Sequence, residues 1–87
     1  MVKRELGGLA ERGPAAARLR DTALVYLQQG SMTKATEALT VHKNTVLYRM
    51  QQVDELLPRP LDEHRMALEV ALRGVATLGE RVLAEPG

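Results

Sequence analysis

The sequence contains no cysteine, which excludes a disulfide framework and a thiolate metal site. It also contains no phenylalanine or tryptophan and has two tyrosines, so its apolar residues are mostly alanine, leucine, valine and methionine. Good helix formers are abundant among these, whereas the aromatic and β-branched residues that favour strands are sparse. The composition therefore predicts an all-α fold.

Long apolar runs are absent as well. No segment reaches the roughly 18 consecutive apolar residues that a membrane-spanning helix needs, and no signal-peptide pattern is present. A length of 87 residues is enough for one small hydrophobic core but not for two. We therefore expect residues 1–87 to form a single cytoplasmic domain that does not associate with a membrane.

Side chains arranged for catalysis or metal binding are missing too. The sequence has no glycine-rich phosphate loop and no nucleophile paired with a base, so we expect no enzyme and no cofactor. His42 and His64 are the two histidines, and neither lies near a cysteine or a matched carboxylate cluster in the sequence. A capping or surface role is therefore favoured for both over a metal site, and no metal is expected.

An excess of positive charge, which many DNA-binding domains have, is also absent. The chain has 12 Lys and Arg residues against 11 Asp and Glu residues, which gives a formal net charge of +1. This near-neutral balance counts against a nucleic-acid partner, so such a function has to be argued from where the charges lie.

The most informative pattern lies in residues 31–57. Apolar residues recur there at helical spacing in two runs: Met32, Ala35, Ala38 and Leu39, then Val46, Met50, Val53 and Leu57. The three residues 40–42 between the runs are too few to let two helices lie antiparallel, so we expect a steep crossing, as in a helix-turn-helix. We predict an all-α helix-turn-helix DNA-binding domain of about four to five helices, with residues 31–57 as its core.

Small and capping residues mark the turn of this motif. Ser31 is expected to cap the first helix and His42 the second. Thr36 falls where the first helix presses against the second, a place that favours a small side chain. Thr40 occupies the turn position where a positive φ is often needed, so the turn either avoids that conformation or carries strain. Val41 is expected to plug the core.

The segment before the motif predicts two helical pieces. Residues 1–14 are expected to form a leader or a short helix over Lys3–Glu11, and a second helix should run from Ala15 to Gln29. Pro14 suits the first position of that second helix. Gly30 is placed to end it as a left-handed C-cap.

The segment after the motif predicts one long helix. Pro58 and Pro60 are expected to end the motif, and a C-terminal helix should run over residues 61–85, with Asp62 as its N-cap. Its apolar residues cover more than one face: Leu68, Leu72, Val75, Leu78 and Val82, widened by Met66, Val70, Ala71 and Leu83. One small core cannot cover so wide a face, so we expect a homodimer that uses this helix. The alternative is that both faces pack within a monomer.

Charged and polar residues are segregated along the second helix of the motif. Its first half carries Lys43, Asn44, Thr45, Tyr48 and Arg49, and its second half carries Asp54 and Glu55. A helix that enters a groove tip-first needs its negative charges held away from the phosphates, and this order provides that. A solvated surface face is the plain alternative.

Base contacts are expected from the outward side of this helix. With Val46 and Met50 facing inward, the outward residues are Lys43, Asn44, Leu47, Tyr48 and Gln51. Lys43 can donate to guanine O6 or N7, Asn44 can pair with adenine N6 and N7, and Tyr48 can donate to a base or a phosphate. We therefore predict base contacts from Lys43, Asn44 and Tyr48.

Phosphate contacts are expected from two helices. Thr45 and Arg49 suit phosphates on the second helix. Ser31, Thr33 and Lys34 join them at the start of the preceding helix, where the helix dipole also attracts anions.

The run VHKNTVLYRMQQVDEL at residues 41–56 resembles the signature at the C-terminal end of the PucR/CdaR type of bacterial transcriptional regulators, where Val-His-Arg-Asn-Thr-Val-Arg-Tyr-Arg-Leu is typical. The spacing of the matching residues is intact: His42, Asn44, Thr45, Tyr48 and Arg49. The similarity covers roughly residues 6–74. It implies a DNA-binding module that, in such regulators, follows a larger N-terminal sensor domain.

The chain departs from the typical run where the family usually has arginine, at Lys43, Leu47, Gln51 and Gln52. The loss of three positive charges should weaken the attraction to phosphates and its salt dependence. The leading hypothesis is sequence-specific binding of double-stranded DNA by a dimer. The alternative is a helical dimerisation or protein-interaction module with little DNA affinity, and Leu47 and the neutral glutamine pair favour it.

Overall fold

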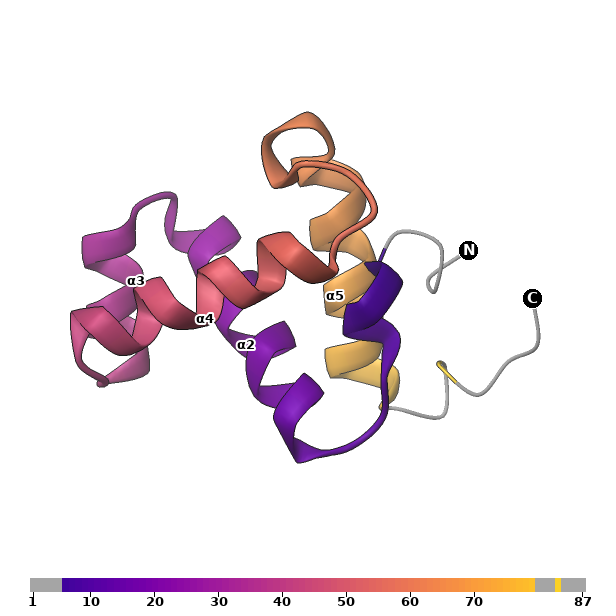
Figure 1. Cartoon of the computed structure of the whole chain (residues 1–87), viewed down its shortest axis with the longest axis horizontal. Coiled ribbons are helices and arrows are strands. Elements are labelled where there is room, and N and C mark those ends of the chain that lie inside the picture. The colour runs from indigo at the N-terminus through magenta and orange to yellow at the C-terminus, as the bar shows by residue number, and fades with distance from the viewer. Residues whose placement is uncertain (1–5, 80–82, 84–87) are drawn as a thin grey trace.

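The computed structural model describes residues 6–79 and Leu83, and within them it contains helices and no strand. In chain order the elements are the 3₁₀ helix η1 (Gly7–Ala10), α2 (Pro14–Gln29), α3 (Met32–Leu39), α4 (Lys43–Leu56), the 3₁₀ helix η2 (Leu61–Glu63) and α5 (Arg65–Leu78) (Figure 1). The predicted all-α class is therefore confirmed. Within the described residues, none of the helices has the length and apolar character needed to span a membrane.

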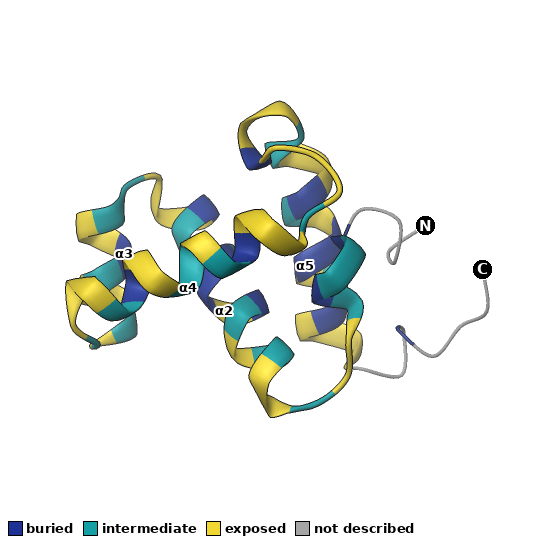
Figure 2. Ribbon diagram, viewed as in Figure 1, coloured by how far each residue is buried: buried dark blue, intermediate teal, exposed yellow. Residues whose placement is uncertain are grey.

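Helix α2 lies at the centre of the fold and packs against η1, α3, α4 and α5. Figure 1 shows α3 and the start of α4 on one side of α2, with α5 and η1 on the other. The main hydrophobic core joins α2 to η1, to α5 and to the end of α4. Its buried members are Leu6, Leu9, Ala23, Leu27, Val53, Leu61, Leu68, Ala71, Leu72, Val75 and Leu83. Figure 2 shows these buried positions as dark bands where the helices face one another.

The helix ends follow the local signals in the sequence. Pro14 is at the start of α2, and Gly30 ends that helix with φ 80°, its N–H donating to the Tyr26 carbonyl oxygen. Ser31 caps α3, because its Oγ accepts from the Lys34 N–H at 3.1 Å. His42 caps α4, because its Nδ1 accepts from the Asn44 N–H at 3.1 Å. The predicted boundaries of the helix-turn-helix are therefore confirmed.

The turn between α3 and α4 adopts the strained alternative. Thr40 has φ 52° and ψ 41°, and among the described residues it is the one non-glycine with a positive φ. The small residue that α3 buries is Ala35, which is fully buried, and not the predicted Thr36. Thr36 is half-buried, and its hydroxyl donates to the Met32 carbonyl oxygen at 2.8 Å. Val41 is half-buried at the turn and does not belong to the main core.

The N-terminal glycines make a close approach between η1 and α4 possible. A Cβ atom on Gly7 would lie 2.7 Å from the Leu56 carbonyl oxygen, and one on Gly8 would lie 2.6 Å from Leu56 Cδ2. Leu6 and Leu9 are fully buried on either side of this contact. Gly7 and Gly8, which weaken helix propensity, thus allow η1 to pack closely against the end of α4. The first part of the predicted Lys3–Glu11 helix, residues 3–5, lies outside the described residues, as do residues 1 and 2.

Two details of the predicted C-terminal helix are wrong. Asp62 is not its N-cap: it lies in η2, and its carboxylate pairs with Arg65 at 3.2 Å. Helix α5 begins at Arg65 and ends at Leu78, because Gly79 takes φ 86°, so one continuous helix does not fill residues 61–85. Val82 and residues 80, 81 and 84–87 lie outside the described residues.

Some of the apolar residues of α5 lie on its exposed outer side, and the others face the core. Leu68, Ala71, Leu72 and Val75 face the core and are buried. Met66, Val70 and Leu78 are 83%, 67% and 54% exposed. The core therefore covers one face of α5 and leaves a second apolar face on the surface.

Replacing Thr40 with glycine tests the strain in the turn. The left-handed conformation costs a non-glycine residue roughly 1–2 kcal/mol, and the greater freedom of glycine in the unfolded chain offsets part of the gain. The Thr40 hydroxyl donates only to the exposed Leu39 carbonyl oxygen, where water can replace it. We expect Thr40→Gly to raise the free energy of unfolding by about 0.5–1 kcal/mol in urea titrations followed by circular dichroism.

The matched control is Thr77→Gly, at an exposed threonine inside right-handed α5, which should lower stability because glycine is a poor helix former. Equal losses in the two variants would show that Thr40 carries no strain.

Candidate nucleic-acid interface

Helix α4 divides into a buried side and an exposed side along its length. Val46 and Val53 are fully buried, and Met50 and Leu57 pack partly buried against the core. All five residues predicted to point outward are exposed: Lys43, Asn44, Leu47, Tyr48 and Gln51. The predicted orientation of the helix is therefore confirmed.

Charge is segregated along the axis of α4. Lys43 stands in the first turn, and Asp54 follows eleven residues later, about 16 Å further along the helix at about 1.5 Å per residue. Both side chains are exposed. The end of α4 nearer the turn therefore presents a positive charge and polar groups, and its far end presents carboxylates.

The start of α3 lies at the same edge of the domain as the first half of α4. Thr33 and Lys34 are exposed there, and Ser31 is half-buried as the cap residue. Because Ser31 Oγ satisfies the Lys34 N–H, the remaining free N–H groups of the first turn belong to the residues just before it. Such groups attract anions.

Arg49 is held by the protein more closely than the sequence indicated. It is half-buried, and its Nη1 donates to Thr22 Oγ1 on α2 at 3.3 Å. Thr22 is fully buried and donates its own hydroxyl hydrogen to the Arg18 carbonyl oxygen at 2.9 Å. Thr45 is also half-buried. No local sequence pattern predicts the contact between Arg49 and Thr22, because 27 residues separate them in the sequence.

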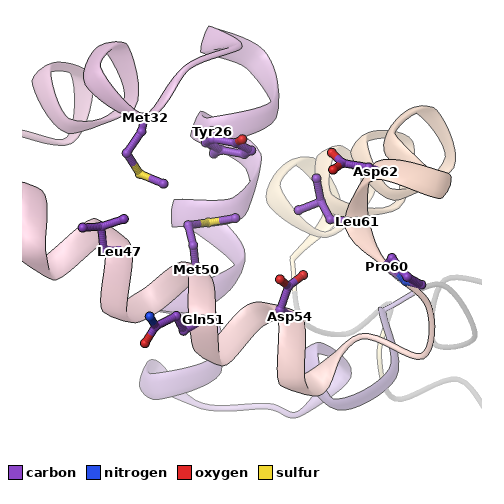
Figure 3. Close-up of a pocket in the computed structure, with 9 residues that line it drawn as sticks. All are labelled: Tyr26, Met32, Leu47, Met50, Gln51, Asp54, Pro60, Leu61 and Asp62. Atoms are coloured by element: carbon purple, nitrogen blue, oxygen red, sulfur yellow. The ribbon is translucent and has the colours of Figure 1, made fainter.

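A cleft of about 280 Å³ opens beside α4, between the end of α2, the start of α3 and the η2 turn (Figure 3). Its lining residues are Tyr26, Met32, Leu47, Met50, Gln51, Asp54, Pro60, Leu61 and Asp62. Figure 3 shows Met32, Leu47 and Met50 gathered at one end, with Asp54 and Asp62 toward the other. No pattern in the sequence predicts this cleft, although helical periodicity does predict that Leu47 lies on the outer side of α4.

The acidic end of the cleft is tied to α5. Arg65 pairs with Asp62 at 3.2 Å, and its guanidinium carbon lies 5.8 Å from the centre of the Tyr26 ring. These contacts join η2 and α5 to α2. Among the described residues, no group of three or more His, Asp or Glu side chains gathers closely enough to hold a metal ion.

Comparisons with known proteins agree with this geometry. The sequence profile described as PucR C-terminal helix-turn-helix domain matches residues 19–74. The chain is similar to the purine catabolism regulatory protein of Bacillus subtilis (strain 168), with 38% identity over 71 residues. That similarity covers 78% of this chain and 13% of the relative, so the chain spans only a small part of that protein's length. No solved structure matches the chain at a significant level.

The matched region contains α3, the turn and α4 in full, together with most of α2 and α5. The resemblance carried by residues 41–56 is therefore confirmed. Because the profile covers more than half of the sequence, the chain belongs to the family of PucR C-terminal helix-turn-helix domains.

Proposed function

We propose that this domain binds double-stranded DNA sequence-specifically, as the C-terminal module of a bacterial transcriptional regulator, with α4 in the major groove. The observation that supports this most is the exposed outer side of α4, which carries base-recognising side chains in its first half and carboxylates in its second. Family membership supports it further, and the similar Bacillus subtilis protein is named as a regulatory protein. By the same similarity, a sensor domain would precede this module in the parent protein.

Base recognition is assigned to Lys43, Asn44 and Tyr48, all of them exposed. The backbone N–H of Asn44 is taken by the His42 cap, which leaves its side-chain amide to pair with adenine N6 and N7. Lys43 would donate to guanine, and the 62% exposed Tyr48 to a base or the adjoining phosphate.

Phosphate binding is assigned to the start of α3 and to the flank of α4. Ser31, Thr33 and Lys34 would meet one strand through side chains and free N–H groups. Thr45 and Arg49 would meet the other flank of the groove. Arg49 uses one N–H group on Thr22, and a guanidinium has five, so the contact with α2 would orient the side chain toward a phosphate without exhausting its donors.

A homodimer is proposed through the outer face of α5. Met66, Val70 and Gly74 are spaced four residues apart and lie on one line along the helix. Apart from the backbone of α5 and the residues next to Gly74, no atom lies within 4 Å of a Cβ built on Gly74, so the space in front of this glycine, called the Gly74 notch below, is open. If two α5 helices pack antiparallel about a two-fold axis at Val70, each Met66 side chain meets the Gly74 notch of the other copy. Two-fold symmetry also suits DNA, where half-sites repeat about every 34–36 Å.

Asn44→Ala should weaken binding to the preferred duplex by about 1–3 kcal/mol and binding to random duplexes much less. Alanine keeps the N–H that His42 accepts, so the start of α4 should be retained. Mobility-shift titrations on both duplexes measure the two losses, and equal losses would remove Asn44 from base recognition.

Lys34→Ala and Arg49→Ala should each flatten the dependence of log K on log salt by about one unit, because each removes one phosphate contact. Arg49→Ala should also lower the free energy of unfolding by about 1 kcal/mol, since it loses the bond to Thr22. Lys34→Ala should not, because Lys34 is exposed.

Arg18→Ala, which removes an exposed cation on α2 away from the proposed dimer face, is the control and should keep the wild-type salt slope. An unchanged slope in either test variant would mean that its side chain does not meet a phosphate. A wild-type domain without salt-dependent DNA binding would favour the protein-interaction module.

Val70→Glu should convert the dimer to a monomer, because it places two carboxylates at the two-fold axis, and sedimentation equilibrium would measure this. Helicity should be retained, since Val70 is 67% exposed in the monomer. Ala38→Glu, at an exposed position on α3, is the control and should remain dimeric. A wild type that stays monomeric at high micromolar concentration would contradict the α5 dimer for this chain.

A further inference from the structure

Leu47 is an apolar side chain in the middle of a polar surface. It is 39% exposed on the outer side of α4, where Asn44 precedes it by three residues and Gln51 follows it by four. Residues at these spacings are neighbours on a helix surface. The leucine therefore lies between two amide side chains, at the level where the first half of α4 would meet base edges.

Leu47 is also one wall of an apolar notch. Together with Met32 and Met50 it forms the end of the cleft nearest the start of α3 (Figure 3). Met32 is the first residue of α3 and is half-buried, directly before the exposed Thr33 and Lys34. The notch thus opens on the edge that also carries the proposed phosphate donors.

Electrostatics restrict what can enter this notch. The opposite end of the cleft carries Asp54, whose charge repels phosphates, and Asp62, whose charge is offset in part by Arg65 at 3.2 Å. The charge of Asp54 therefore favours approach of a DNA strand at the Met32 and Leu47 end. Of the groups that the four base pairs expose in the major groove, the C5-methyl of thymine is the apolar one, and apolar side chains recognise it by contact.

We infer that Leu47 is a specificity-determining residue that contacts a thymine methyl group in the major groove, with Met32 as the second wall of the contact. This inference rests on the proposed function. Asn44 lies about 4.5 Å from Leu47 along the helix axis at about 1.5 Å per residue. The thymine is therefore expected within one or two base pairs of the adenine assigned to Asn44.

Replacing thymine with deoxyuridine tests the contact, because it removes the methyl group and leaves the hydrogen-bonding edge unchanged. The 87-residue chain is first used to select its preferred duplexes from a random pool. Each thymine of a selected duplex is then replaced in turn, and affinities are measured by fluorescence anisotropy. We expect the affinity to fall about fourfold at one thymine in each half-site. A fourfold change in Kd corresponds to the free energy of burying about one methyl group.

The affinity of Leu47→Ala for the selected duplex should be lower than that of the wild type by a factor of about four or more. This variant should also bind the thymine and deoxyuridine duplexes with equal affinity. Alanine favours helices, so α4 should remain folded, and circular dichroism checks this. Leu56→Ala, which truncates a leucine of the same 39% exposure near the acidic end of α4, is the control and should keep the fourfold discrimination.

The outcomes separate this inference from the proposed function. If the wild type binds the selected duplexes but tolerates deoxyuridine at every position, the methyl contact is wrong and DNA binding stands. If Leu47→Ala keeps the discrimination, another side chain makes the contact and the assignment to Leu47 is wrong. If the chain enriches no sequence from the pool, sequence-specific DNA binding is overturned, and the role of Leu47 with it.

Discussion

Three nearly consecutive residues of α2 have to hold three different parts of the domain, and the arrangement of the other helices depends on this. Arg20 is 5% exposed, and its Nη1 donates to the Leu9 carbonyl oxygen at 2.8 Å and to the Glu11 carbonyl oxygen at 2.6 Å, which fixes η1. Thr22 accepts from Arg49 and so meets α4, while Ala23 is fully buried in the core. A buried guanidinium without carbonyl partners would be strongly destabilising, so η1 has to lie where Arg20 can reach it.

Two other contacts hold α4, one at each of its ends. His42 caps its start, and the η1 glycines allow close packing against Leu56 at its end. Val46 and Val53, buried between these points, fix its rotation. Side chains on a rigid helix are placed more reproducibly than side chains on a loop, so the outer side of α4 is preorganised before any partner binds. The strain at Thr40 is tolerated because packing on both sides of the turn determines its conformation.

Features with local causes could be predicted from the sequence. Gly30, Ser31 and His42 act through residues at most four positions away, so their roles as helix ends follow from residue type and spacing. The inward and outward sides of α4 follow from helical periodicity in the same way. The family resemblance then supports the function that is proposed for that exposed side.

Features that depend on distant residues could not be predicted. The contact between Arg49 and Thr22 joins residues from different helices, and the cleft beside Leu47 exists only once η2 is placed against α2 and α4. The end of α5 was also missed, because periodicity continues through Gly79 in the sequence while the backbone turns there. Ala35 and Thr36 are adjacent in the sequence, and the rotation of α3, which distant packing sets, decides which of them is buried.

The contribution of η1 to the core also bears on where this domain begins and ends. The family profile covers residues 19–74, yet the hydrophobic core includes Leu6, Leu9 and Leu83, each at most 2% exposed. A fragment cut to the matched residues would lose these three leucines and also the two carbonyl groups that satisfy Arg20. The region that the family profile matches is therefore smaller than the set of residues that builds the core, and the flanking leucines contribute to that core through their apolar side chains.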